Sequence, residues 1–402
     1  MKNILVGQSG GPTSVINASL YGVIKESLDN DIEKIYGMVN GIEGFLEDKC
    51  IELQNLSEEK LKLLKITPSA FLGSCRFKLP SDYNDDIYKR IFKKLSEKNI
   101  GYVVYIGGND SMDTVNKLAH YADMVMSKVK FIGVPKTIDN DLVCTDHTPG
   151  FGSAAKFIAT AVRDITYDAE VYDKKSVTIV EIMGRHAGWL TAASIMAREE
   201  KEDNPVLVYL PEIEFDVFEF VQNVKEALTK KNNVVVCVSE GIKDKTGKFI
   251  CEYINEAKLD VFGHKSLTGC GKYLENEIKE KLGVKVRSIE LNVLQRASSL
   301  TLSETDVEES ENVGREAVKA ILDGETHVMV AIVRDEDYNI SYDTVNVLKV
   351  CNKERTFPIE WIINKNDISD DFIQYISPII KGNVEVSRDE LGMPKYIKAV
   401  KS

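Results

Sequence analysis

A short polar segment directly follows one of the most apolar runs of the chain. Lys136, Thr137, Asp139 and Asp141 come just after the run Phe131–Val134, which we expect to be a buried strand. In open α/β sheets, ligands bind at the carboxyl ends of the strands. Phosphoryl transfer requires a cation for the moving phosphate and a carboxylate that orients the attacking hydroxyl. The segment supplies both groups, although a surface turn with a lysine and aspartates is also common.

Two glycine-rich turns also stand between a predicted strand and a predicted helix. They are Gly7–Thr13, after the first strand, and Gly107–Ser111, after a later one. Glycines let backbone N–H groups approach an anion, and the positive end of the next helix adds to the attraction. The same residues fit a tight turn with φ > 0, and the polar residues that close the second turn fit helix N-caps. The first turn also matches Gly-x-Ser-x-Gly, so a serine hydrolase that uses Ser9 is a distant alternative.

Charged residues recur at the ends of other predicted strands. A Met-Gly-Arg motif at 183–185 follows the strand Ser176–Ile182, and Glu240 follows a later strand. An arginine at a strand end can hold a phosphate with two hydrogen bonds, and a glutamate can accept hydrogen bonds from sugar hydroxyls. Each of these residues also fits an ordinary helix start or a solvated surface. Three further arginines carry little information alone: Arg76, Arg287 and Arg296.

The composition fits a soluble globular protein, and the length fits two domains. The chain has 402 residues, of which 43% are hydrophobic and 28% charged, and this length exceeds one typical core. A formal net charge of -12 argues against nucleic acid binding. The sequence contains no run of ~20 apolar residues, so no membrane span is predicted. The seven cysteines are scattered, so we expect reduced thiols in the cytoplasm and neither a zinc site nor disulfides.

Apolar strand-like runs alternate with amphipathic helical patterns along the chain, from Asn3–Gly7 and Ser14–Leu28 to Thr305–Leu322 and Val328–Val333. One helical pattern covers His186–Arg198. Strict alternation predicts α/β domains in which parallel sheets are covered by helices on both sides. The expected boundary lies near residue 150, where Thr-Pro-Gly interrupts the pattern.

The combination of Gly-Gly-x-x-Ser, Thr-Ile-Asp-x-Asp and Met-Gly-Arg, in this order, resembles the 6-phosphofructokinase family and specifically its pyrophosphate-using branch. The resemblance extends from Gly7 to beyond Arg296. It implies two three-layer α/β domains with mainly parallel sheets. The donor domain would comprise 1–150 and about 297–350, and the sugar-phosphate domain 151–296 and about 351–402. The implied reaction transfers a phosphoryl group from pyrophosphate to the 1-hydroxyl of fructose 6-phosphate, with Mg²⁺.

The resemblance also assigns roles to residues. Asp139 is similar to the general base that takes the proton from the sugar's 1-hydroxyl. The residues with implied catalytic roles are Asp139, Lys136, Asp110 and Arg76. The diphosphate-binding residues are Gly11, Arg76 and Lys136, and the metal ligands are Asn109 and Asp141. The residues similar to the fructose 6-phosphate site are Thr137, Ile138, Asp139, Met183, Gly184, Arg185, Glu240, Arg287 and Arg296.

Two positions indicate the donor. The family's ATP enzymes typically carry glycine where this chain has Asp110 and Lys136. A carboxylate at the first position would repel a nucleotide's α-phosphate, and an ammonium at the second would neutralise the transferring phosphoryl group. In the family, the Arg287 position is supplied by a neighbouring subunit, which implies a homodimer or homotetramer with shared active sites.

Three positions depart from the family pattern. Asn109 stands where the family usually shows an aspartate metal ligand, Leu294 replaces a histidine near the sugar phosphate, and Ser176 stands where the ATP enzymes place an arginine. An ATP-dependent or mixed-donor enzyme of the same fold therefore stays open. A sugar-phosphate sensor without turnover is a further alternative, although a sensor needs no base such as Asp139.

Overall fold

The computed structural model describes residues 3–253 and 269–400, and its contacts divide the chain into two compact units. Unit 1 comprises the residues up to 153, residues 296–354 and the residues from 381 onward. Unit 2 comprises residues 154–295 and 355–380. The segment that begins at 381 therefore belongs with unit 1, whereas the family resemblance implied that about 351–402 belong to the second domain.

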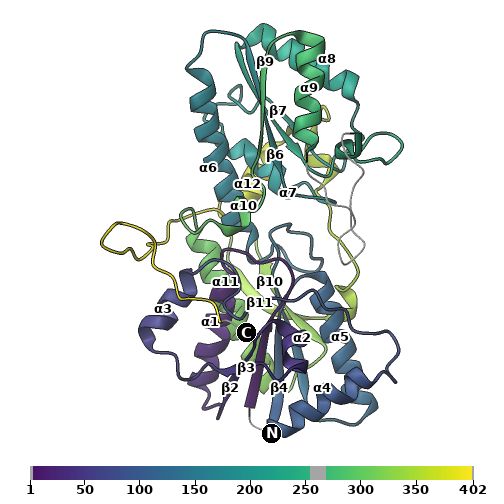
Figure 1. Cartoon of the computed structure of the whole chain (residues 1–402), viewed down its shortest axis with the longest axis vertical. Coiled ribbons are helices and arrows are strands. Elements are labelled where there is room, and N and C mark those ends of the chain that lie inside the picture. The colour runs from purple at the N-terminus through teal and green to yellow at the C-terminus, as the bar shows by residue number, and fades with distance from the viewer. Residues whose placement is uncertain (1–2, 254–268, 401–402) are drawn as a thin grey trace. The chain divides into compact units, whose positions relative to one another are not determined.

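Unit 1 is built on a seven-stranded sheet with the order β11-β10-β5-β4-β1-β2-β3 (Figure 1). Its strands are β1 Asn3–Gln8, β2 Ile35–Met38, β3 Cys50–Glu52, β4 Ile100–Gly107, β5 Lys130–Pro135, β10 Val328–Arg334 and β11 Ile340–Asn346. The inner pairs are parallel, and the edge strands β3 and β11 are antiparallel to their neighbours. Neither edge strand was predicted from the sequence, and the expectation of mainly parallel sheets is confirmed.

Alternation along the strands of unit 1 places a helix layer on each face of the sheet. On β1, Ile4 and Val6 pack in one core, which includes side chains of α1 (Ile16–Asp29) and α11 (Glu304–Leu322). Leu5 packs in the core on the opposite face, with side chains of α4 (Asp86–Glu97) and α5 (Asn109–Met124). Successive side chains of a strand point to opposite faces, so one apolar strand serves both cores. The remaining helices of unit 1 are α2 Gly41–Leu46 and α3 Glu58–Ile66.

Unit 2 has a four-stranded parallel sheet with the order β7-β8-β6-β9. Its strands are β6 Ser176–Ile182, β7 Leu207–Tyr209, β8 Asn233–Ser239 and β9 Lys285–Glu290. Its main helices are α6 Phe151–Glu170, which begins in unit 1, α8 Val217–Lys230 and α9 Cys270–Leu282. Val177 and Ile179 of β6 pack in one core with side chains of α8 and α9.

The helix expected over His186–Arg198 is shorter than predicted. Only α7, Trp189–Ala192, is α-helical, and a 3₁₀ turn follows over Ala193–Ala197. The Glu212 carboxylate accepts the N–H of Gly188 at 2.8 Å and thereby ties the residue before the helix to another loop. This long-range contact fixes a non-helical residue before α7 that a local periodicity cannot indicate.

Residues 355–380 are joined to unit 2 by aromatic packing. Phe357, Trp361, Phe372 of α12 (Asp370–Ile376) and Tyr375 surround Trp189, with ring centroids 5.1 to 6.3 Å away. A short hairpin of β12 (Ile362–Ile363) and β13 (Asp367–Ile368) lies within the same segment. Within residues 3–253 and 269–400, no helix combines the length and the apolar character needed to cross a membrane.

Candidate active site

The two glycine-rich turns of unit 1 meet at the centre of its sheet. They follow β1 and β4, which pair in parallel with Gln8 opposite Ile106. From β1 the chain continues to β2 and from β4 it continues to β5, on opposite sides of the β1–β4 pair. This is the kind of strand reversal at which open α/β sheets bind ligands. The hydroxyls of Ser9 and Ser111 lie 2.8 Å apart and join the turns directly.

Glycine is required at specific points of these turns. Gly10 has φ +77°, in the left-handed region. A Cβ on Gly11 would lie 3.1 Å from a guanidinium nitrogen of Arg296, and one on Gly107 would lie 1.9 Å from the Ser111 hydroxyl. The tight-turn interpretation of the first motif therefore holds, and the close approach of Arg296 places a cation at the same turn.

The segment with Arg76 is bound to the first turn through backbone groups. The N–H of Gly10 donates to the carbonyl of Cys75 at 3.2 Å, and the Ser74 hydroxyl donates to the carbonyl of Gly10 at 2.7 Å. The Gly10 amide therefore already has a partner within the protein. The arrangement brings Arg76 close enough to contribute to the lowered pKa of Lys136.

Lys136 is the most buried charged group of the predicted site, with 3% of its surface exposed. Its Nζ donates to the carbonyl of Gly11 at 2.6 Å. Burial lowers the pKa of Lys136 to about 8, and Arg296 acts in the same direction, while the carboxylates of Asp139 and Asp141 oppose the shift. The ammonium therefore lies among two carboxylates and two guanidinium groups at the carboxyl end of β5.

Asp139 lies in the same loop, two residues beyond Thr137, whose hydroxyl accepts the N–H of Asp139 at 3.1 Å. Burial raises the pKa of the Asp139 carboxyl, and the positive charges of Lys136 and Arg296 counteract the shift. Ile138, between them, is buried. The structure thus brings an acceptor carboxylate and two cations together.

Arg296 belongs to unit 1 and lies beside Gly11. The resemblance assigned it, with Arg287, to the 6-phosphate of the sugar. Because its charge lowers the pKa of both Lys136 and Asp139, Arg296 lies near these two groups within its own unit. Sequence alone could not indicate this, because more than 150 residues separate Arg296 from the two charges it influences.

Asn109 is engaged in a contact that the sequence did not suggest. Its side-chain oxygen accepts the N–H of Asn352 at 2.5 Å, and its amide group donates to the carbonyl of Lys353 at 2.6 Å. Asn109 therefore clamps the peptide that precedes Glu354. The negative charge of Glu354 helps to raise the pKa of Asp139, so the clamped segment lies near the predicted base.

The residues present fit a Mg²⁺ ion that is shared with a substrate. Within the part of the chain that the structure describes, no group of three histidine, cysteine or acidic side chains is arranged as a metal cage. Mg²⁺ is usually bound by one or two carboxylates together with substrate phosphates. Asp139 and Asp141, both close to Lys136, supply carboxylates of this kind, and the exposed Asp110 lies in the first turn of α5.

The predicted sugar-phosphate residues of unit 2 meet at the carboxyl ends of β6 and β8. The N–H of Gly184 donates to the Glu240 carboxylate at 3.4 Å, and the Ser239 hydroxyl donates to the carbonyl of Gly184. A Cβ on Gly241 would lie 2.1 Å from the carbonyl oxygen of Arg185, which explains the glycine there. The N–H of Met183 donates to the Gln295 side chain at 3.2 Å, a contact without a sequence signal.

Arg287 lies apart from that group. It is in the middle of β9, opposite Thr178 of β6, with its Nε 3.1 Å from the threonine hydroxyl. Its guanidinium forms an ion pair of 2.5 Å with Asp168 of α6. The strand ends that carry Arg185 and Glu240 lie several residues further along the sheet. Within a single chain, Arg287 therefore lies away from these two residues.

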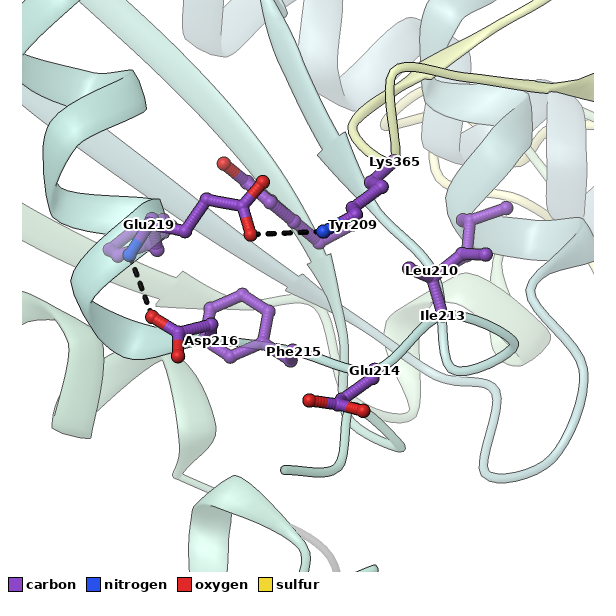
Figure 2. A pocket seen from close by; sticks show the side chains of 9 residues that line it. Tyr209, Leu210, Ile213, Glu214, Phe215, Asp216, Glu219 and Lys365 are labelled. Atoms are coloured by element: carbon purple, nitrogen blue, oxygen red, sulfur yellow. Dashed lines mark hydrogen bonds and ion pairs between the residues drawn. The ribbon is translucent and has the colours of Figure 1, made fainter. Parts of the chain in front are cut away.

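Two other features do not form sites. The Ser9 hydroxyl is buried against Ser111 rather than a histidine, and a hydrolase nucleophile requires a neighbouring base. A small hollow in unit 2 is lined by Tyr209 and Phe215, and Lys365 and Glu219 at its edge form an ion pair of 3.2 Å (Figure 2). Its volume of about 10 Å³ holds at most about one water molecule.

Comparisons with known proteins show the family of the chain. The phosphofructokinase family model matches residues 3–321. The chain is 40% identical, over 384 residues and 94% of both chains, to the pyrophosphate–fructose 6-phosphate 1-phosphotransferase of Rhodospirillum rubrum. The corresponding protein of Xanthomonas campestris is 38% identical over 98% of this chain and 95% of its own.

A solved structure gives the same result for the fold. The pyrophosphate-dependent phosphofructokinase of Nitrosospira multiformis superposes with a TM-score of 0.90 at 34% identity, covering 99% of this chain and 97% of the other. The expected α/β fold is therefore confirmed. The chain belongs to the phosphofructokinase family.

Proposed function

We propose that this protein transfers a phosphoryl group from pyrophosphate to the 1-hydroxyl of D-fructose 6-phosphate, giving fructose 1,6-bisphosphate and phosphate. The observation that carries the proposal is the buried ammonium of Lys136 beside the Asp139 carboxylate, with Arg296 at the neighbouring turn. The names of the relatives support the same reaction. Because the phosphate bonds broken and formed are similar, the reaction is readily reversible. In this proposal it serves glycolysis.

Asp139 acts as the general base in this proposal. Its carboxylate orients the sugar's 1-hydroxyl and takes the proton as the oxygen attacks the phosphorus. Burial keeps the carboxyl more basic than an ordinary aspartate, because it raises the pKa. Thr137 fixes the backbone of Asp139, and Ile138 excludes water from one side of it.

Lys136 and the arginines stabilise the charge of the transferring group. A phosphoryl group carries spread negative charge in the transition state, and fixed cations in a site with little water act on it strongly. Lys136 is held ready by the Gly11 carbonyl, and Arg76 and Arg296 lie within electrostatic reach. A bound pyrophosphate would replace the carbonyl as the partner of the ammonium.

The choice of donor rests on Asp110 and Lys136. The exposed carboxylate of Asp110 lies in the first turn of α5, where it would repel the α-phosphate of a nucleotide. The ammonium of Lys136 would neutralise the transferring phosphoryl group in the absence of a nucleotide. Both features favour pyrophosphate over ATP, and no observation in unit 1 favours the nucleotide.

Mg²⁺ would be held by Asp141 and the phosphates of the donor, and when bound it neutralises part of their charge. Asn109 contributes through its clamp on residues 352 and 353 rather than as a charged ligand. In unit 2, the residues that hold the sugar phosphate are Met183, Gly184, Arg185 and Glu240.

Arg287 completes the sugar-phosphate site of a neighbouring subunit in this proposal. It is partly exposed, with 44% of its side chain accessible, and its ion pair with Asp168 is open to solvent. Because the family supplies this position from a neighbouring subunit, the proposed working enzyme is a homodimer or homotetramer, and we place it in the cytoplasm.

The test is a pair of assays on the purified protein with Mg²⁺ and fructose 6-phosphate, one with pyrophosphate and one with ATP. We expect turnover with pyrophosphate and little with ATP. A clear preference for ATP would overturn the role of Asp110 and Lys136 in donor choice. If the protein binds the sugar phosphate but shows no turnover with either donor, it is a sensor and the proposal that it is an enzyme is wrong.

A further inference from the structure

The loop that carries Asp139 is closed by one residue at its far end. The Thr148 hydroxyl donates to the carbonyl of Thr137 at 3.0 Å, and the Thr148 N–H donates to the side-chain oxygen of Asn140 at 3.1 Å. Asp139 lies between the two residues that Thr148 holds. The position of Asp139 therefore depends on the position of Thr148.

The residue next to Thr148 is a buried histidine between two carboxylates. His147 is 1% exposed. Its Nδ1 lies 2.8 Å from Oδ1 of Asp146, and its Nε2 lies 2.5 Å from Oε2 of Glu309, on α11. An ionised carboxylate only accepts hydrogen bonds, so between two ionised carboxylates each ring nitrogen has to donate. Neutral imidazole has one N–H and cannot satisfy both partners, whereas imidazolium can.

The groups around this histidine balance its charge. Arg334, at the end of β10, lies 3.4 Å from the second oxygen of Asp146. The Tyr338 hydroxyl donates to the second oxygen of Glu309 at 3.0 Å, and its ring stacks on the imidazole at 6.3 Å. Asp306 of α11 is a further carboxylate near Glu309. Burial lowers the pKa of His147, but the hydrogen bonds and charges of Asp146 and Glu309 outweigh it and raise the pKa to about 9.

The same segment is fixed to the sheet and to α11 by further bonds. The N–H of Asp146 donates to the carbonyl of Ile332 in β10 at 2.9 Å, and the Ile332 N–H donates to the Thr145 hydroxyl at 3.0 Å. Asp306 accepts the N–H of Gly150 at 2.9 Å. Helix α11 thus holds the loop at two points, through Glu309 and through Asp306.

We propose that His147, as an imidazolium between Asp146 and Glu309, is the positioning residue that keeps the loop and Asp139 in their working geometry. This inference rests on the proposed function, because Asp139 is the proposed base. If His147 loses its proton, either the buried Glu309 or the half-buried Asp146 loses its hydrogen-bond donor, and leaving a charge unpaired at a site with little water is unfavourable. The loop would then shift, and with it the carboxylate that acts on the sugar.

The test compares His147→Gln with Tyr338→Phe, a matched control that removes a hydrogen bond from the same Glu309 but leaves the imidazolium. For His147→Gln we expect kcat to fall by about 10²-fold, the order of loss caused by a misplaced catalytic group. The KM for fructose 6-phosphate should change little, because the unit 2 residues are untouched. Tyr338→Phe should lower Tm and leave kcat nearly unchanged. An equal loss of kcat in both variants would overturn the proposal.

Two readouts do not depend on turnover. In protein with ¹⁵N-labelled histidine, both ring nitrogens of His147 should be protonated at pH 8, and a neutral tautomer would contradict the proposal. Amide hydrogen exchange of residues 137–150 should be faster in His147→Gln, and unchanged exchange would contradict it equally. If the wild type shows no turnover, the proposed function fails, and these two measurements still decide whether the histidine is the charged anchor of the loop.

Glu309→Gln supplies a variant in case His147→Gln does not fold. It removes one negative charge that favours the imidazolium, so the pH at which His147 deprotonates should fall below about 9. The loop should lose its protection against exchange at a correspondingly lower pH than in the wild type. An unchanged pH midpoint would show that Glu309 does not hold the proton.

Discussion

The Nζ of Lys136 donates a hydrogen bond of 2.6 Å to the carbonyl oxygen of Gly11, so the cation after β5 holds the turn after β1. Both residues are part of the proposed pyrophosphate site. The bond keeps the ammonium in place without a ligand, so little of its side-chain freedom is lost when the phosphate arrives.

Lys136→Met should abolish most of the activity. The substitution removes the cation that faces the transferring group, and we expect kcat to fall by about 10²-fold to 10³-fold, the range seen when one electrostatic contact is removed. Lys117 offers a matched control, because it is also buried and its Nζ also donates to a carbonyl, that of Leu79, at 3.0 Å. Lys117→Met should cost stability and leave kcat intact; comparable losses in steady-state kinetics would argue against a specific role for Lys136.

Asp139→Asn should separate chemistry from binding. The amide cannot take a proton, so kcat should fall by about 10²-fold to 10⁴-fold, the contribution of a general base. Dissociation constants for fructose 6-phosphate, measured by calorimetry, should stay close to the wild-type value because unit 2 is unchanged. Near-normal turnover would remove Asp139 from the mechanism.

The pH dependence of kcat/KM should have two limbs. Burial raises the pKa of Asp139, so activity rises with pH as this carboxyl ionises, above the pH at which an ordinary aspartate does. The pKa of Lys136 is lowered to about 8, so the charged form disappears, and activity falls, as the pH increases through about 8. In Lys136→Arg the cation persists, and the alkaline fall should move upward until His147 deprotonates at about 9. If the alkaline fall of kcat/KM stays at the same pH in Lys136→Arg, a group other than Lys136 causes it.

Asn109→Asp distinguishes a metal ligand from a clamp. A carboxylate would strengthen Mg²⁺ binding if the residue were a ligand. As a clamp, the aspartate loses the N–H donor to the Lys353 carbonyl and places a charge beside it. We therefore expect a lower Tm and no gain in apparent Mg²⁺ affinity, measured by activity titration and thermal unfolding with and without the ion. Tighter Mg²⁺ binding in this variant would restore Asn109 to the metal site.

Asp141→Asn addresses the proposed metal contact directly. The substitution keeps the shape of the side chain and removes its charge, so the Mg²⁺ concentration for half-maximal rate should rise several-fold while the KM for fructose 6-phosphate changes little. Asp146→Asn is not a suitable control, because it disturbs the partner of His147; Asp82→Asn, on an exposed turn, is. An identical Mg²⁺ requirement in Asp141→Asn and the wild type would exclude the contact.

Much of the fold follows from local patterns. The strands and main helices were predicted where short apolar runs alternate with amphipathic stretches, because each core strand such as β1 has to serve two apolar layers. The antiparallel edge strands β3 and β11 were missed, since an edge strand has one paired side and a weaker apolar signal. The order of the polar motifs also indicated the family, because each motif stands at a strand end where sheet geometry makes side chains converge.

The sequence by itself determined the chemistry that is available: a lysine and two aspartates after one strand, and glycines where backbones approach closely. Tertiary structure decided which charges act together. It placed Arg296 beside Gly11, engaged Asn109 with residues 352 and 353, and set His147 between Asp146 and Glu309. Each of these depends on contacts between residues far apart in the chain, whose distances and burial set the pKa of a group, and no local pattern encodes them.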